Sequence, residues 1–474
     1  MEQKQLNIFL NVDERYSGKT KYVFNTLCRV LGLKPRFFTG LTSEVIHLYY
    51  GKRTEDIYPV HIYHDPGAAD FFEKKEIYPI EQVSLMKYQD EYVPVLFSKQ
   101  GELIRYTSNS IRLRKDIISS AFYFLSCWQE YASSAEISPQ SQYDYYKSFQ
   151  YSFGFTDIPP VDRYCEILAN MLKKAFPEFV FSSIWPEGKK YAISLSHNVE
   201  FWNVWTENFI AKITQEKNNP FHESYWQVFW KAIIHKYSRK IFKDPAKLIK
   251  LIIRREKILK ASSSFFLLTK SDFPDERRNY FKNEQYFKQI VQLLKDGSVN
   301  LQGSKEAGFQ YHFLPEELQK LEGFSANGFR VRYLNFNYQN LFSVLEQGAI
   351  KYDSSVGFDE KIGFRAGISY PFQPYNLKED RPFNILEIPL IAMDLAMQKQ
   401  VDFNYRKAKR KFAQLLDKSK KHRSHFSVCW HTHLSDPIDY PGWSKLYWQI
   451  LKRGRSQNAW LCSLDKLYNY WQNR

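Results

Sequence analysis

Apolar and polar residues along positions 5–130 form short alternating stretches of two kinds. The segments "LNIFLNV" and "EVIHLYYG" are short apolar runs typical of strands. The segments "KYVFNTLCRVLGL" and "DIISSAFYFLSCWQEYA", the latter starting at Asp116, have apolar residues at helical spacing. This alternation predicts a small N-terminal α/β domain over residues 1–131.

A polar stretch separates this domain from the rest of the chain. Residues 132–148, "ASSAEISPQSQYDYYKS", are rich in Ser and contain a proline, which is typical of loops. We therefore expect a linker or a long crossing loop over residues 132–158 and a second domain over residues 159–474.

Seven apolar runs in the second domain have strand character, and helical patterns separate most of them. Such alternation predicts a parallel α/β barrel or wound sheet, whose active face lies at the carboxyl ends of the strands. The seven predicted strands are residues 191–197, 263–269, 298–304, 330–336, 349–355, 384–390 and 424–431.

The composition is that of a folded soluble protein, with 44% apolar and 25% charged residues. The five cysteines are scattered and contain no CxxC pair, so the sequence predicts neither a disulfide framework nor a cysteine zinc site. No segment has the apolar core of a signal peptide or the length of a membrane span. We therefore expect a cytoplasmic protein.

The formal charge of +16 is concentrated in a few segments. Residues 231–260 carry eleven Lys or Arg with apolar residues between them, inside a helical insertion expected at about 203–260. The pattern predicts one or two amphipathic basic helices with a break at "KDPAK". These helices either lie on an anionic membrane at its inner face or pack their apolar sides on their own domain. No nucleic-acid reading module accompanies the charge, so nucleic acid is not an expected partner.

Polar and ionisable residues recur at most of the predicted strand ends. Because these ends meet on one face, their recurrence predicts a functional cleft there. The residues are His197, Asn198, Glu200, Gln302, Ser304, Glu306, Arg332, Asp353, Arg365, Asp394, His431 and His433.

Five motifs in a fixed order resemble those of bacterial polysaccharide deacetylases, the NodB-homology enzymes, in the variant with an extra N-terminal α/β domain. The motifs are "ISLSHNVE", "VNLQGSKEA", "YDSSVGFDEKIGFRAGISYPF", "LEIPLIAMD" and "FSVCWHTH". The resemblance covers nearly the whole chain and implies a distorted (β/α)7 barrel. It also implies hydrolysis of acetyl groups on a glycan or lipid-linked glycan precursor.

In that family a divalent metal, usually zinc, is held by an aspartate and histidines, and it activates the attacking water. A second aspartate acts as base and a late histidine as acid. The late histidine corresponds to His431 here, and a hydrogen-bonded core histidine is the alternative. Asp394 either orients His431 or has a cap or turn role. Arg365 resembles the family's conserved arginine; a simple ion pair with Asp353 or Glu387 is the alternative. Expected substrate contacts are Arg332, Asp353, Tyr370 and Trp430, the last two by stacking on sugar rings.

The motif residues that would bind the metal depart from the family pattern. Asn198 and Gln302 stand where the family has an aspartate and a histidine, and neutral amides are weak zinc ligands. A rearranged zinc site would draw on His197, Asn198, Glu200, Gln302 and Glu306, with Glu200 as the remaining catalytic carboxylate. Two hypotheses stay open: a metal-dependent deacetylase, and a carbohydrate-binding or regulatory relative without metal or activity.

Overall fold

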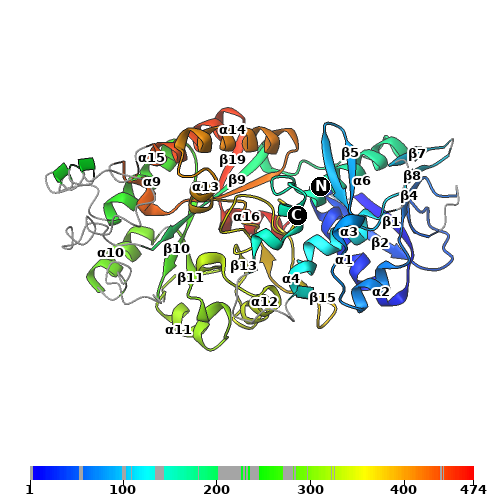
Figure 1. Ribbon diagram of the computed structural model, residues 1–474, viewed down its shortest axis with the longest axis horizontal. Helices are drawn as coiled ribbons and strands as arrows, with labels where there is room; N and C mark the ends of the chain where they lie inside the picture. The colour runs from blue at the N-terminus through cyan, green and yellow to red at the C-terminus, as the bar shows by residue number, and fades with distance from the viewer. Residues whose placement is uncertain are drawn as a thin grey trace.

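The structure is a computed structural model with two units that lie side by side, the N-terminal unit on the right in Figure 1. It describes residues 4–52, 57–98, 103–107, 109–133, 143–179, 181–200, 226–227, 230, 233–234, 245–270, 281, 284–295, 297–321, 323–324, 326–437, 440 and 442–474. No helix among these residues is long and apolar enough to span a membrane.

The N-terminal unit is built on a six-stranded sheet with the order β2-β1-β3-β4-β8-β7, parallel except for the β7–β8 pair. This arrangement confirms the predicted α/β class. The strands are β1 (Lys4–Asn11), β2 (Leu33–Phe38), β3 (Leu48–Gly51), β4 (Val60–Tyr63), β7 (Ile104–Tyr106) and β8 (Ile111–Leu113). A separate hairpin joins β5 (Ser84–Tyr88) to β6 (Glu91–Val95). The helices are α1 (Glu14–Leu31), α2 (Ala68–Glu73), α3 (Ile117–Leu125), α4 (Trp128–Ser133), α5 (Phe149–Ser152) and α6 (Pro160–Ala175).

Local signals fix both ends of α1. The carboxylate of Asp13 accepts a hydrogen bond from the backbone N–H of Arg15, so one of the free N–H groups of the first turn is satisfied. Gly32 ends the helix in the left-handed conformation, at φ 68°, which costs glycine little. Val23, Phe24 and Leu27 line the buried side of the helix between these ends.

The C-terminal unit contains a nine-stranded sheet in which all strand pairs are parallel. Eight strands follow the order β16-β13-β12-β11-β10-β9-β18-β17, and β19 also pairs with β9. The strands are β9 (Tyr191–Val199), β10 (Ser263–Leu268), β11 (Ser298–Gly303), β12 (Gly328–Val331), β13 (Tyr352–Asp353), β16 (Leu386–Glu387), β17 (Ala392–Met393), β18 (His425–Cys429) and β19 (Ala459–Ser463).

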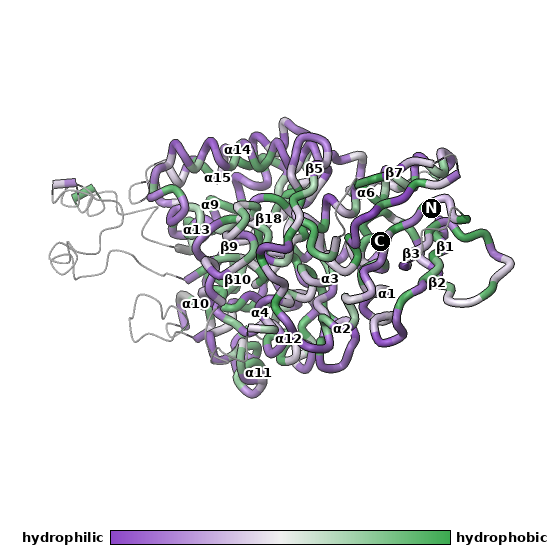
Figure 2. Tube along the Cα trace, turned by 45° about the vertical axis from the view of Figure 1, so that its right-hand side comes forward, coloured by the Kyte–Doolittle hydropathy of each residue, from purple (hydrophilic) through white to green (hydrophobic). Residues whose placement is uncertain are grey.

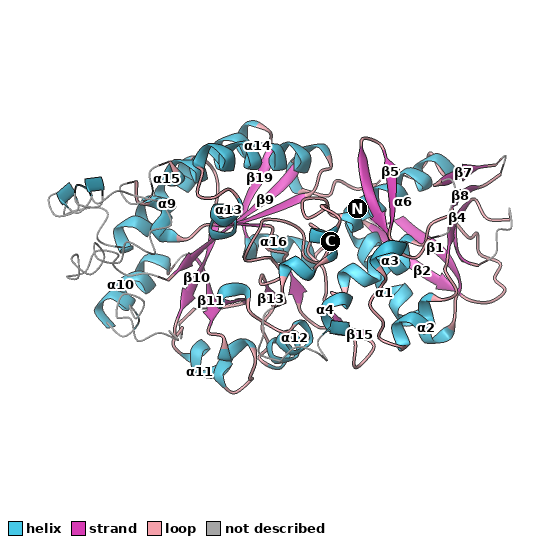
Figure 3. Ribbon diagram, in the orientation of Figure 1, coloured by secondary structure: helices cyan, strands magenta, loops and turns pink. Residues whose placement is uncertain are grey.

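Helices surround this sheet, and Figure 3 shows them outside the strands. Figure 2 shows hydrophobic colour along the central strands and hydrophilic colour along much of α14. The helices are α9 (Pro245–Ile258), α10 (Glu284–Leu294), α11 (Phe313–Gln319), α12 (Tyr338–Gln347), α13 (Asp394–Gln400), α14 (Tyr405–Lys421), α15 (Trp443–Ser456) and α16 (Leu464–Gln472). A small hairpin, β14 (Tyr375–Asn376) and β15 (Arg381–Pro382), completes the unit.

The sheet curls because its two edge strands belong to one stretch of chain. β16 and β17 are separated only by residues 388–391, which span at most about 18 Å between the strands. The N–H of Ile388 donates to Asp353 O at one edge, and the N–H of Ile391 donates to Ser427 Oγ beside the other edge. Among the described residues, β16 and β17 are edge strands that do not pair with each other, so the sheet does not close. The structure therefore shows a curled parallel sheet, and the seven-stranded barrel stays a prediction.

All seven predicted strands are present in the sheet of the C-terminal unit, and one of them is shifted along the sequence. In its described residues this sheet contains two further strands. The strand predicted at residues 330–336 is β12 and ends at Val331, because Arg332–Leu334 form a 3₁₀ turn in which Tyr333 and Leu334 have positive φ. β17 and β19 were not predicted. β17 has only two residues, and the short run "AWLCS" of β19 has no clear alternation.

The predicted basic helices lie partly outside the described residues, which omit 201–225 and 235–244. Helix α9 begins at Pro245, within "KDPAK", so the predicted helix after that break is confirmed. Its apolar residues Leu248, Ile249 and Ile252 are buried on the protein itself. This burial favours packing of the apolar side of α9 on its own domain, and contact of the basic helices with a membrane stays a prediction.

Ion pairs and hydrogen bonds connect the two units. The Arg365 guanidinium makes a two-point ion pair with Glu130 of α4, at 2.8 and 2.7 Å, and also donates to Gly357 O. Asp162 of α6 accepts a hydrogen bond from the N–H of Ser369. Because α6 contacts both α1 and α3, it packs on the N-terminal unit, and the predicted boundary at residue 159 stays a prediction.

We expect Glu130→Ala to lower the free energy of unfolding by about 3–5 kcal/mol, because it leaves the Arg365 charge buried without its partner. Denaturant unfolding at neutral pH measures the change. Glu284→Ala is the control, because Glu284 pairs with Lys288 on the surface and its loss should leave unfolding almost unchanged. Equal effects of the two substitutions would contradict the importance of the Arg365 pair.

Candidate functional site

Four predicted site residues meet at the carboxyl ends of the strands: Glu200, Gln302, Asp394 and His431. Glu200 directly follows β9, Gln302 is the second-last residue of β11, Asp394 follows β17 and His431 follows β18. Gln302 Nε2 donates to Glu200 Oε1, and His431 Nε2 lies 3.6 Å from the same oxygen. All four side chains are nearly or fully buried.

Asp394 orients His431 through both of its oxygens. Its Oδ1 lies 2.7 Å from His431 Nδ1, and its Oδ2 accepts the backbone N–H of His431 at 2.6 Å. The same carboxylate accepts the N–H of Leu395 in the first turn of α13, which begins at Asp394. Asp394 therefore fixes the imidazole ring from the start of this helix.

The charges of Glu200 and His431 support each other. Burial opposes ionisation of Glu200, but the His431 imidazolium and the nearby Arg332 outweigh it and lower the pKa of the carboxyl to about 2. Burial likewise disfavours the imidazolium, but Asp394 and Glu200 raise the pKa of His431 well above its usual range. At neutral pH the site is therefore an ion triad with a protonated histidine between two carboxylates.

The guanidinium of Arg330 fills the sheet interior next to this triad. Its donors reach Asn198 Oδ1 at 2.9 Å, Ser196 Oγ and Ser354 Oγ at 3.0 Å each, Ser354 O at 2.9 Å and Cys429 Sγ at 3.2 Å. The group also lies over the ring of Phe266 at 4.2 Å. The contacts account for all five N–H donors, so this buried cation is fully satisfied.

Two further carboxyl groups, Asp353 and Glu387, face each other from the paired strands β13 and β16. Burial and then the neighbouring Asp353 raise the pKa of Glu387 well above its usual range, and burial also raises the pKa of Asp353. Burial therefore disfavours ionisation of each carboxyl group, and their proximity disfavours ionisation of both at once. Ser355 donates to Asp353 through its N–H and its hydroxyl.

Buried cations and carboxyl groups lie close together in the described part of the interior. The cations are Arg330, Arg332 and His431, and Glu200 and Asp394 flank His431. These resident cations oppose binding of a divalent cation, because like charges repel strongly where they are buried.

Among the proposed metal ligands Glu200 and Gln302 are in contact, but His197 does not join them. Side chains alternate along β9, so Asn198 and Glu200 face the interior while His197 faces the other way. His197 Nδ1 bonds to Trp430 O at 2.8 Å, and its Nε2 lies 2.9 Å from Glu256 Oε1. Among the described residues no group of three or more His, Cys, Asp or Glu is arranged to hold a metal. With Asn198 bound to a guanidinium as well, these residues do not fit a divalent metal.

The remaining predicted residues lie elsewhere. Arg365 pairs with Glu130, not with Asp353 or Glu387. Tyr370 stacks on Trp185 and Trp471 and lines a cavity with residues 421–423, which precede β18, and Trp430 is buried against Phe412 and Tyr447. Arg332 is buried and acts on Glu200 through its charge, while Glu306 begins a 3₁₀ turn after β11.

Sequence reasoning missed Arg330, Glu387 and Glu256 as interior groups. A signal for Arg330 existed, because residues two apart on a strand share a face and Arg332 was already a candidate. Glu256 had no signal, since it comes from the basic helix α9 and contacts His197 only in the folded chain.

We expect Glu200→Gln to destabilise the protein by about 3 kcal/mol at pH 7, because the folded-state pKa of Glu200 falls from 4.5 to about 2. A lowered pKa stabilises the fold above pH 4.5, and this contribution is lost as the pH falls toward 2. The difference in unfolding free energy between the variant and the native protein should therefore shrink below pH 4.5. Glu178→Gln, on the surface, should show no such trend, and a pH-independent difference for Glu200→Gln would contradict the ion triad.

Comparison with known proteins gives weak similarities only. Residues 8–177 match a family of unknown function, DUF7033. A Mycobacterium smegmatis protein assigned as a polysaccharide deacetylase aligns with a TM-score of 0.40 and 13% identity, covering 61% of this chain and 92% of that chain. Agd3, a carbohydrate deacetylase, aligns with a TM-score of 0.33 and 6% identity, covering 99% and 87%. No curated protein matches. At these scores neither structure assigns a function.

Proposed function

We propose that this protein is a carbohydrate-binding relative of the polysaccharide deacetylases that recognises an N-acetylated glycan without hydrolysing it. The class of ligand comes from the motif resemblance of the sequence. The absence of hydrolysis is inferred from the protonation states and charges at the strand ends.

The ion triad is poorly suited to proton transfer. A general base works best with a pKa near the working pH, and Glu200, with a pKa of about 2, is a very weak base. His431 keeps its proton at neutral pH and cannot serve as base either. Asn198 stands where the family has an aspartate and has no ionisable proton. Within the described part of the site, these three residues therefore supply no base, and the proposed ligands do not fit a metal that could activate water.

One observation carries the binding proposal: a buried hydrogen-bond acceptor next to Glu200 is unsatisfied within the described site. Gln302 Oε1 is buried and has no hydrogen-bond partner among the described residues. The Nε2 of His431 lies 3.4 Å from Asn198 Nδ2 and 3.6 Å from Glu200 Oε1, both longer than an ordinary hydrogen bond. An acetamide group has a matching N–H donor and carbonyl acceptor. In the proposal its N–H donates to Gln302 and its carbonyl accepts from His431.

Calorimetric titration with an N-acetylglucosamine tetramer tests this function. We expect binding that the glucosamine tetramer does not reproduce, and no release of acetate. Gln302→Leu should weaken binding about tenfold, because it removes the acceptor for the acetamide N–H. The surface variant Lys409→Ala should bind as the native protein does. Acetate release, or equal affinity for the two tetramers, would contradict the proposal.

Metal analysis after dialysis against zinc tests the proposed lack of metal-dependent hydrolysis. We expect far less than one zinc per chain in the native protein and also in Asn198→Asp with Gln302→His, because the new carboxylate would pair with Arg330. Adding Arg330→Gln to these two changes removes the resident cation and should raise zinc binding. Near-stoichiometric zinc in the native protein would instead support the metal-dependent deacetylase.

A further inference from the structure

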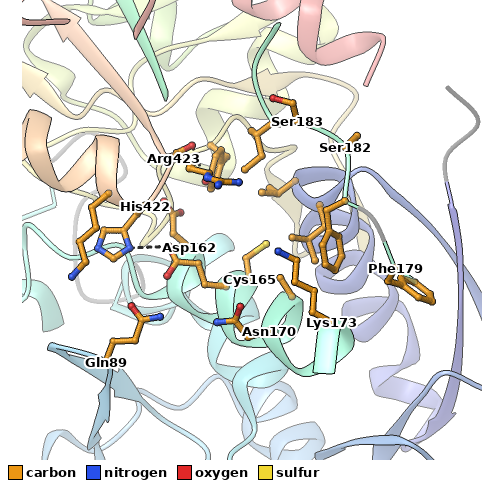
Figure 4. Close-up of a pocket in the computed structure, with 18 residues that line it drawn as sticks. Gln89, Asp162, Cys165, Asn170, Lys173, Phe179, Ser182, Ser183, His422 and Arg423 are labelled. Atoms are coloured by element: carbon orange, nitrogen blue, oxygen red, sulfur yellow. Dashed lines mark hydrogen bonds and ion pairs between the residues drawn. The ribbon is translucent and has the colours of Figure 1, made fainter. Parts of the chain in front are cut away.

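A cavity of about 650 Å³ lies at the opposite end of the strands from the ion triad (Figure 4). Residues 421–423, which line it, precede β18, whereas His431 follows that strand. β9 likewise begins after the cavity-lining residue Ile184 and ends directly before Glu200. The length of this strand places its two ends about 25 Å apart. The volume is in the range of sites for small organic ligands.

One face of α6 forms a wall of this cavity. Its lining residues recur at helical spacing, and the small side chains of Cys165 and Ala169 leave room at the centre. The end of α1, Phe179 and residues 181–184 provide apolar surface opposite, including Leu31 and Phe181. The lining residues of α6 are Asp162, Cys165, Glu166, Ala169, Asn170 and Lys173.

The acidic groups of the cavity are already compensated. Glu166 lies 3.0 Å from Arg163 Nη1 and 3.0 Å from His422 Nδ1. Both oxygens of Asp162 accept hydrogen bonds from Ser369, and burial raises the pKa of this carboxyl to about 7. Neither group therefore leaves a full negative charge for a ligand to meet.

Two cations in the cavity have no carboxylate partner among the described residues: Lys173 and Arg423. Lys173 only approaches the ring of Phe181, at 5.5 Å. The carbonyl of Arg423 accepts from Trp185 and Tyr370, which fixes its backbone, while its guanidinium makes no ion pair within the described part of the chain. Figure 4 shows the two side chains reaching into the cavity from different walls.

We propose that this cavity binds a small organic anion, whose carboxylate or phosphate lies between Lys173 and Arg423 and whose apolar body packs on Leu31, Ala169 and Phe181. Two converging cations suit a planar or tetrahedral anionic group, and the apolar wall selects against a free inorganic ion. The site is separate from the glycan site and does not depend on it.

Fluorescence titration with 1-anilinonaphthalene-8-sulfonate, an organic anion with an apolar body, tests the site on the full chain. We expect one saturable site whose affinity falls at least tenfold in Lys173→Gln with Arg423→Gln. Ala169→Phe should abolish binding by filling the cavity. Lys409→Ala, which removes a surface cation of α14 outside the cavity, should leave the affinity unchanged, and circular dichroism verifies folding of each variant.

Competition separates the two classes of head group. Displacement of the probe by octanoate supports a carboxylate ligand, and displacement by a phosphate monoester such as hexyl phosphate supports a phosphate ligand. Unchanged probe affinity in the Lys173–Arg423 double variant would overturn the proposal. Failure of both competitors at millimolar concentration would overturn it as well.

Discussion

The interior of the C-terminal sheet depends on the compensation of buried charges. Water solvates these groups poorly, so each cation needs an anion or a full set of acceptors within reach. Arg330 meets this need with neutral acceptors, and His431 meets it with Asp394 and Glu200. Within the described part of the interior, these buried cations therefore have anions or acceptors supplied by the chain itself.

The alternation of side chains along β9 divides the predicted site into two networks. Asn198 and Glu200 point inward to Arg330 and Gln302, whereas His197 points outward to Glu256 of α9. Tyr447 also donates to Glu256, which ties α9 and α15 to the strand. A histidine next to the site in sequence therefore stabilises helix packing on the far side of the sheet.

The sequence predicted the α/β class, the seven strands and the convergence of Glu200, Gln302, Asp394 and His431, because strand patterns and strand ends are local features. It could not predict which way His197 faces, because a one-residue difference in register reverses the face. Nor could it place Arg365 against Glu130, since the two residues are 235 positions apart and belong to different units. The raised pKa values of Asp353 and Glu387 arise from burial and from the pairing of β13 with β16.

The departures from the deacetylase motifs are coupled through Arg330. A carboxylate at position 198 would lie near Glu200 and Asp394, and such a cluster of negative charge is stable when a divalent cation is bound. With an amide at 198 the same position needs only a hydrogen-bond donor, and the guanidinium provides it at 2.9 Å. With that guanidinium in place, a histidine at position 302 would lie near His431, and no metal would be bound between the two imidazoles. The amides at 198 and 302 and the arginine at 330 therefore form one consistent set, in which each residue suits the charge state that the others impose.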